Sequence, residues 1–76
     1  MLLKIFLLEE DFDCLRKFVP YDSTCRSVLD GAVPLGNTRV LDCDDIEARQ
    51  LIIHALAHCP AAAANISRDI RAAGLT

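Results

Sequence analysis

The sequence lacks several features that mark whole classes of proteins. No stretch approaches about 20 consecutive apolar residues, so no membrane-spanning helix is expected. Lysine and arginine number 8 against 11 aspartate and glutamate residues, and the net charge of −3 provides no basic surplus for tight non-specific nucleic-acid binding or for a polybasic membrane anchor. No glycine-rich phosphate loop is present, because Gly31 and Gly36 are isolated. The 76 residues leave no room for a second core, and we expect residues 1–76 to form a single domain.

The chain begins with the apolar segment MLLKIFLL, which raises the question of a signal peptide. Lys4 interrupts this run, and Glu9, Glu10 and Asp11 follow where the small residues of a cleavage site would be expected. We therefore interpret residues 2–8 as a strand that is covered on both faces. We also expect a cytoplasmic protein.

The expected redox state of the four cysteines follows from this cytoplasmic location, and no two of them form a CxxC pair. Structural disulfides are rare in a reducing compartment. We therefore predict that all four are free thiols that serve as small core residues. They are Cys14, Cys25, Cys43 and Cys59.

Apolar spacing and capping residues predict the order of the elements. Strands are expected at 2–8 and 39–43, and helices at 10–19, 45–58 and 61–73. The segment 22–37 stays open between two interpretations. It forms either a short helix that ends at Gly31, which we favour, or a hairpin in which 25–29 pairs with 38–43. The expected fold is a small α/β or α+β domain with a minimal two- or three-stranded sheet packed by helices, in the order β-α-(α or β)-β-α-α.

The clearest element is the helix that follows Asp44. Asp44 and Glu47 have the spacing of a capping box. The helical wheel places an apolar face opposite a polar stripe. The apolar face carries Ala48, Ile52, Ala55, Leu56 and Cys59, and the polar stripe carries Glu47, Gln50, His54 and His58. We therefore predict that Ile52, Leu56 and Cys59 are buried.

Two groups of residues have a spacing or position that catalytic or metal sites use, but their surroundings do not favour such a site. His54 and His58 have the i, i+4 spacing of a metal site, but they lie on the polar stripe without the glutamate of an HExxH motif, while Cys59 points to the apolar side. Cys43 lies at a helix N-terminus, which favours a thiolate. The neighbouring carboxylates oppose that ionisation. We predict no catalytic residue, no metal, no cofactor and no enzymatic activity.

Acidic residues gather in two clusters, each directly after a predicted strand. The clusters are Glu9, Glu10, Asp11 and Asp13, and Asp42, Asp44, Asp45 and Glu47. If the two strands are parallel neighbours, both clusters emerge at the same edge of the sheet. The two interpretations are solvation and capping of two helix N-termini, or an acidic pole that binds a basic partner or a divalent ion. We take these eight residues as the candidate partner-binding site.

The expected function follows from the balance of apolar residues and available core. A two- or three-stranded sheet leaves open edges, and a hydrophobic fraction of 53% is hard to bury in 76 residues. Association with another protein chain would cover both the open sheet edges and the apolar residues that the core cannot bury. We therefore expect a small protein-binding module, such as a regulator, adaptor or inhibitor of a larger protein, that forms a homodimer through an apolar sheet edge or helix face.

An alternative function comes from the C-terminal helix, residues 61–73. The sequence NISRDIR at 65–71, followed by AAGL, resembles the recognition helix of arginine-repressor-type winged helices. The resemblance implies a small nucleic-acid-binding regulator that uses this helix. The negative net charge makes nucleic acid the less expected partner.

Overall fold

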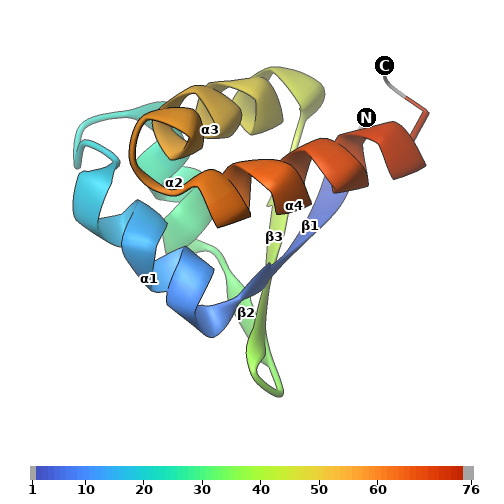
Figure 1. Ribbon diagram of the computed structural model, residues 1–76, viewed down its shortest axis with the longest axis horizontal. Helices are drawn as coiled ribbons and strands as arrows, with labels where there is room; N and C mark the ends of the chain where they lie inside the picture. The colour runs from blue at the N-terminus through green and yellow to red at the C-terminus, as the bar shows by residue number, and fades with distance from the viewer. Residues whose placement is uncertain (1, 75–76) are drawn as a thin grey trace.

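The fold is built from seven short elements whose ends follow local signals. The computed structural model describes residues 2–74. The elements are β1 (Leu3–Leu8), α1 (Glu9–Phe18), α2 (Thr24–Asp30), β2 (Val33–Leu35), β3 (Thr38–Cys43), α3 (Asp45–His58) and α4 (Pro60–Ala72) (Figure 1). The expectation of a small mixed domain with a minimal sheet is confirmed.

Local capping explains where the helices begin and end. The capping box is present, because the Asp44 carboxylate accepts from the Glu47 N–H at 2.7 Å and the Glu47 carboxylate accepts from the Asp44 N–H at 2.9 Å. The helix α3 has the predicted bounds, 45–58. Proline at the first position starts α4, and Gly74 follows its end with a φ of 78°.

The segment 22–37 contains the helix that the sequence favoured, and also a strand that was not expected. The Ser23 hydroxyl accepts from the Arg26 N–H at 3.3 Å and begins α2. The hairpin between 25–29 and 38–43 does not form. Instead, β2 pairs with β3 across a two-residue turn, in which Gly36 has a φ of 62°. Glycine at the first turn position favours a type II′ hairpin, which suits the twist of the strands.

The sheet has the order β1-β3-β2 and is antiparallel throughout. Leu3 lies opposite Cys43 and Leu8 opposite Thr38. The parallel arrangement that the acidic pole requires is therefore wrong. The start of β3 lies beside the end of β1, so the two strands run in opposite directions.

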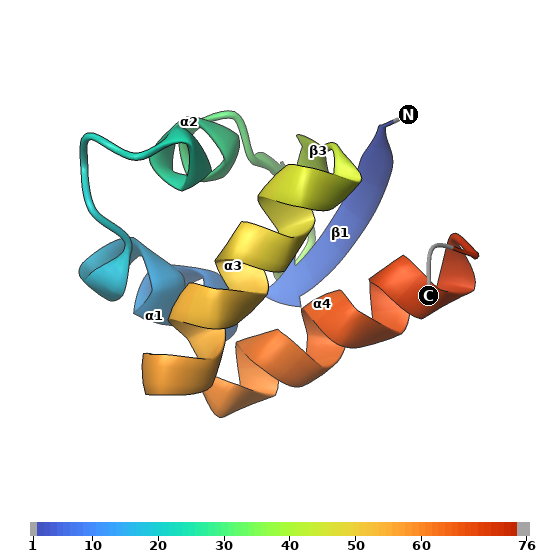
Figure 2. The same cartoon turned by 90° about the horizontal axis from the view of Figure 1, so that it is seen from above.

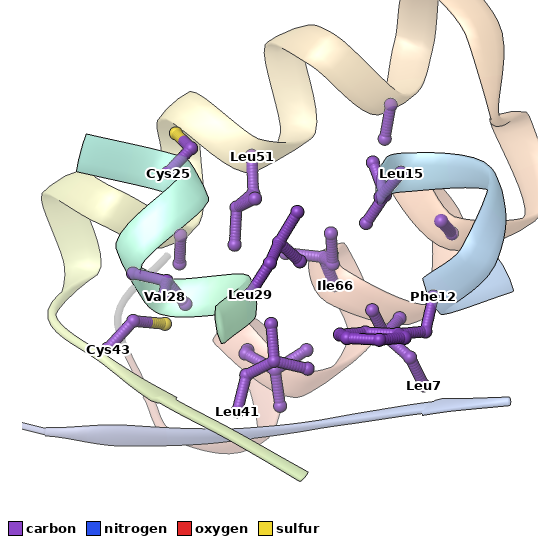
Figure 3. Packing of buried hydrophobic residues seen from close by; sticks show 14 of the residues in the cluster. Leu7, Phe12, Leu15, Cys25, Val28, Leu29, Leu41, Cys43, Leu51 and Ile66 are labelled. Carbon is purple, nitrogen blue, oxygen red and sulfur yellow. The ribbon is translucent and has the colours of Figure 1, made fainter. Parts of the chain in front are cut away.

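The core lies between the inner face of the sheet and the helices. Figure 3 shows Leu7 beside Phe12 of α1 and Leu41 below Leu29 of α2, with Ile66 of α4 and Leu51 of α3 deeper among the helices. The helix α4 lies along β1 (Figure 2). The interpretation of residues 2–8 as a strand covered on both faces is wrong, because Leu3, Ile5 and Leu7 are buried while the alternate residues face outward.

The buried face of α3 agrees only in part with the predicted one, because Cys59 is buried as expected but the two other predicted residues are not fully buried. Leu56 is 67% exposed and Ile52 is only partly buried, whereas Ala48, Leu51 and Ala55 are fully buried. Apolar side chains surround most of this helix, so periodicity alone could not select the packed face. The packing of α3 against α4, α1 and α2 decides it.

The prediction of four free thiols is wrong for two of them. Cys14 and Cys59 form a disulfide, with their Cα atoms 6.2 Å apart and a separation of 45 positions along the sequence. The packing of α1 against the junction of α3 and α4 brings them together, and sequence spacing does not reveal such proximity. Cys25 and Cys43 are free and buried, as expected. A disulfide is unusual in a reducing compartment, and a cytoplasmic location stays a prediction.

Candidate interaction surface

The outward face of the sheet carries apolar side chains from all three strands. Phe6 lies opposite Val40, and Val40 lies opposite Val33 on the other edge. In the next row Leu8 and Leu35 flank Thr38. Paired residues of antiparallel strands project on the same side, so these side chains form one surface. We define Phe6, Leu8, Val33, Leu35 and Val40 as the outer sheet face.

Much of the outer sheet face is accessible to solvent. Phe6 is 42% exposed and Leu35 is 62% exposed. A shallow pocket of about 240 Å³ continues this surface toward α4, where Asn65 and Arg68 form its polar side. Phe6 and Arg68 lie beside apolar side chains in this pocket. Aromatic residues and arginine are enriched in protein interfaces.

Both open edges of the sheet are protected against strand addition. At the β1 edge, the backbone N–H of Phe6 donates to the Asp69 carboxylate of α4 at 2.9 Å. At the β2 edge, Pro34 lies in the middle of a three-residue strand and has no N–H to offer. Association through a sheet edge is therefore disfavoured, and the outer sheet face is the part of the sheet that remains open to a partner.

Charged pairs border the sheet at its two ends. Lys4 Nζ lies 2.8 Å from Asp42 Oδ1 on the outward side. At the other end Arg39 Nη2 lies 2.6 Å from Glu9 Oε1. Exposed ion pairs of this kind contribute about 0–1 kcal/mol each to stability, so their effect is mainly to provide a polar border.

The acidic residues predicted to form one pole lie at opposite ends of the sheet. Antiparallel pairing places Glu9, Glu10, Asp11 and Asp13 near the start of β3, and places Asp42, Asp44, Asp45 and Glu47 near the start of β1. Several of them have local roles. Asp11 accepts from the Asn65 amide at 3.2 Å, and Asp44 and Glu47 cap α3. The residues do not form a single site, so the acidic-pole hypothesis is not supported further.

A second apolar surface lies on α3, away from the sheet. Ile46, Ile53 and Leu56 are each more than half exposed, and we define them as the α3 ridge. Between α3 and α4, a pocket of about 280 Å³ is lined partly by Ile52 and Ile70. The α3 ridge contains no aromatic side chain and comes from a single helix, whereas the outer sheet face joins three strands.

The free thiols are protected from ionisation. Burial and, to a smaller extent, the Glu47, Asp44 and Asp42 carboxylates together raise the pKa of Cys43 to about 11. Burial and Glu47 also raise the pKa of Cys25. A thiol with a raised pKa is a poor nucleophile at neutral pH. The argument from sequence that carboxylates oppose a Cys43 thiolate is therefore confirmed in its direction, with burial as the larger cause.

The two histidines have separate surroundings. The His58 ring stacks on Phe18 with centroids 4.2 Å apart, and His54 lines a pocket near Ser23 and Thr24 at the start of α2. Within residues 2–74 there is no group of three or more side chains placed to hold a metal ion. No helix in the same range is long and apolar enough to cross a membrane.

The predicted nucleic-acid helix packs along β1. The Asp69 carboxylate of this helix accepts a hydrogen bond from the β1 backbone and lies 3.4 Å from Arg68 Nε, so an acidic group accompanies this arginine.

The chain matches no family model, no curated protein and no solved structure.

The outer sheet face was missed in the sequence, although one signal was present. The outward set of residues 2–8 includes Lys4 beside Leu2, Phe6 and Leu8. A lysine is almost never fully buried without a partner, so its presence indicated that this face meets solvent.

Proposed function

We propose that this protein is a protein-binding module that has no catalytic activity of its own and forms a homodimer through the outer sheet face. The observation that carries the proposal is an exposed apolar surface across three strands in a sheet whose edges are both protected. Contiguous exposed apolar surface is typical of interaction sites. A module of this size acts on a larger protein as a regulator, adaptor or inhibitor.

A second copy of the chain is a suitable partner because the face is complementary to itself. Apolar rows pack against apolar rows when two sheets meet face to face at about 10 Å. Around a two-fold axis, Lys4 of one subunit can approach the partner's Asp42, which converts the polar border into intersubunit ion pairs.

The size of the face sets the expected affinity. A β3 of six residues at about 3.3 Å per residue, with three strands about 4.8 Å apart, gives a footprint of about 300 Å². Stable complexes usually bury about 800 Å² on each partner. The face is small for a stable complex, so we expect a weak dimer that exchanges readily.

Sedimentation equilibrium with two matched variants tests this assignment. Leu35→Glu places a charge in the outer sheet face, and Leu56→Glu makes the same change on the α3 ridge at a similar exposure. We expect the native mass to rise above 8.4 kDa with concentration. The dissociation constant should rise at least about tenfold in Leu35→Glu, because two buried charges would face each other, and stay unchanged in Leu56→Glu.

Three results would count against the proposal. A native mass that stays at 8.4 kDa at all concentrations would remove the homodimer. Loss of association in Leu56→Glu alone would move the interface to the α3 ridge. Salt-sensitive retention on heparin that Arg68→Gln abolishes would favour the nucleic-acid alternative.

A further inference from the structure

A separate pocket at the corner between α1 and α2 has the character of an anion site. It has a volume of about 390 Å³ and is lined by Asp13, Arg16, Lys17, Tyr21 and Arg26. Figure 2 shows this corner on the far side of the molecule from α4 and β1. Its lining comes from α1, α2 and the loop between them, so it shares no residue with the outer sheet face.

Arg26 is the unusual residue in this pocket because it is a buried cation. It is only 4% exposed. Its Nη2 donates to the Arg16 carbonyl at 2.9 Å, which joins α2 to the last turn of α1. Its Nε is buried and has no hydrogen-bond partner among the described residues. Within residues 2–74, none of the ion pairs includes Arg26.

A buried guanidinium without a carboxylate partner is costly, and an anion would relieve the cost. Burial of a charge is tolerated when the charge is paired and its donors are satisfied. One Arg26 donor is satisfied by a carbonyl dipole, and the positive charge itself has no ionic partner. The Tyr21 ring centroid lies 4.0 Å from Arg26 Cζ and provides a cation–π contact on one side.

The charges around Arg26 indicate which anion fits. Three positive side chains and one carboxylate give the lining a local charge of +2, in a chain whose net charge is −3. A phosphate monoester carries a charge of about −1.5 to −2 at pH 7, so it neutralises this lining more fully than a carboxylate does. Arginine also presents paired N–H donors that match phosphate oxygens.

We propose that the α1–α2 pocket binds a phosphate group, with Arg26 as the buried donor and Arg16 and Lys17 as the exposed charges that attract it. Tyr21 is 87% exposed, so it can turn aside and admit a phosphate oxygen to the covered Arg26 donors. The Asp13 carboxylate weakens the attraction and sets a limit on affinity. The phosphate group belongs either to free phosphate or to a monoester.

A titration followed by ¹H–¹⁵N NMR tests the site directly. The probes are inorganic phosphate and O-phosphoserine, each added at constant ionic strength against sodium chloride. We expect saturable shifts of the Arg26 Nε–H signal and of the Tyr21 backbone amide with both probes. Tighter binding of O-phosphoserine identifies a monoester as the ligand class, and equal binding identifies the phosphate group alone.

Matched variants separate a specific site from a general charge effect. Lys17→Gln should raise the dissociation constant about two- to fivefold, as expected for an exposed ionic contact. Arg71→Gln removes the same charge from the exposed side of α4 and should leave it unchanged. Asp13→Asn should lower it. Arg26→Lys keeps the charge but loses the paired N–H donors of the guanidinium, and it should raise the dissociation constant at least about tenfold.

Two outcomes would overturn the proposal. The first is the absence of a saturable shift of the Arg26 Nε–H signal relative to chloride. The second is an equal loss of affinity in Lys17→Gln and Arg71→Gln, which would indicate only net charge. If Arg26→Lys does not fold, the Lys17 and Asp13 variants still decide, because both side chains are exposed.

Discussion

The disulfide between Cys14 and Cys59 should be a major source of stability, and its reduction is the sharpest test of the fold. The bond joins residues 45 apart, so it restricts a large part of the unfolded chain. In the chain-entropy treatment, a loop of this length stabilises the native state by about 4 kcal/mol. A domain of 76 residues is expected to have a total stability of about 4–11 kcal/mol, so the bond accounts for a large share of it.

The expected effect of reduction is a large fall in melting temperature. For a domain of this size each kcal/mol corresponds to about 4–8 °C, so a loss of about 4 kcal/mol predicts a fall of about 15–30 °C. Circular dichroism melts with and without a phosphine reductant measure this directly. Thiol titration in denaturant should count two thiols in the air-oxidised chain and four after reduction, because Cys25 and Cys43 are free in both.

The matched control is the double variant Cys14→Ser, Cys59→Ser. It should melt at a lower temperature than the oxidised native protein, and the reductant should not change its melting temperature further. Four free thiols in air-oxidised protein would refute the packing of α1 against the junction of α3 and α4. A change below a few degrees on complete reduction would show that the bond adds little constraint to this chain.

Three further predictions concern the core, the thiol and the helix cap. Leu51→Ala should lower the free energy of unfolding by about 2–5 kcal/mol in urea titrations and Leu56→Ala by less than about 0.5 kcal/mol, since only Leu51 is fully buried; equal losses would contradict the assigned face of α3. The pKa of the Cys43 thiol is raised from 9.0 to about 11 in the folded protein, so the unfolded chain loses this proton at a lower pH. The free energy of unfolding should therefore fall by about 2–3 kcal/mol between pH 9 and pH 11, and a Cys43→Ala variant must lack this pH-dependent loss. Asp44→Ala should cost about 0.5–2 kcal/mol in the same titrations because it removes the cap of α3, while Asp45→Ala, a control with no capping role, should cost distinctly less.

Local physical chemistry determined much of this protein from the sequence alone. A cap acts within three residues, so Asp44 and Glu47 predict the start of α3 without knowledge of anything else in the chain. Pro60 marks a helix boundary for an equally local reason, because its missing N–H is tolerated at the first position of α4. For this reason the bounds of α3 matched the expectation, and the favoured helix in the segment 22–37 was found.

Tertiary structure decided the features that depend on residues far apart in the chain. The antiparallel direction of β3 beside β1 is a long-range pairing, and it separated two acidic clusters that look alike in sequence. The Cys14–Cys59 bond requires helices that meet only in the folded chain. The outer sheet face exists because helices cover one side of the sheet and α4 covers the edge of β1, and no residue spacing records which side remains uncovered. Spacing along the chain describes each element's own faces, whereas packing selects which of those faces meets the core.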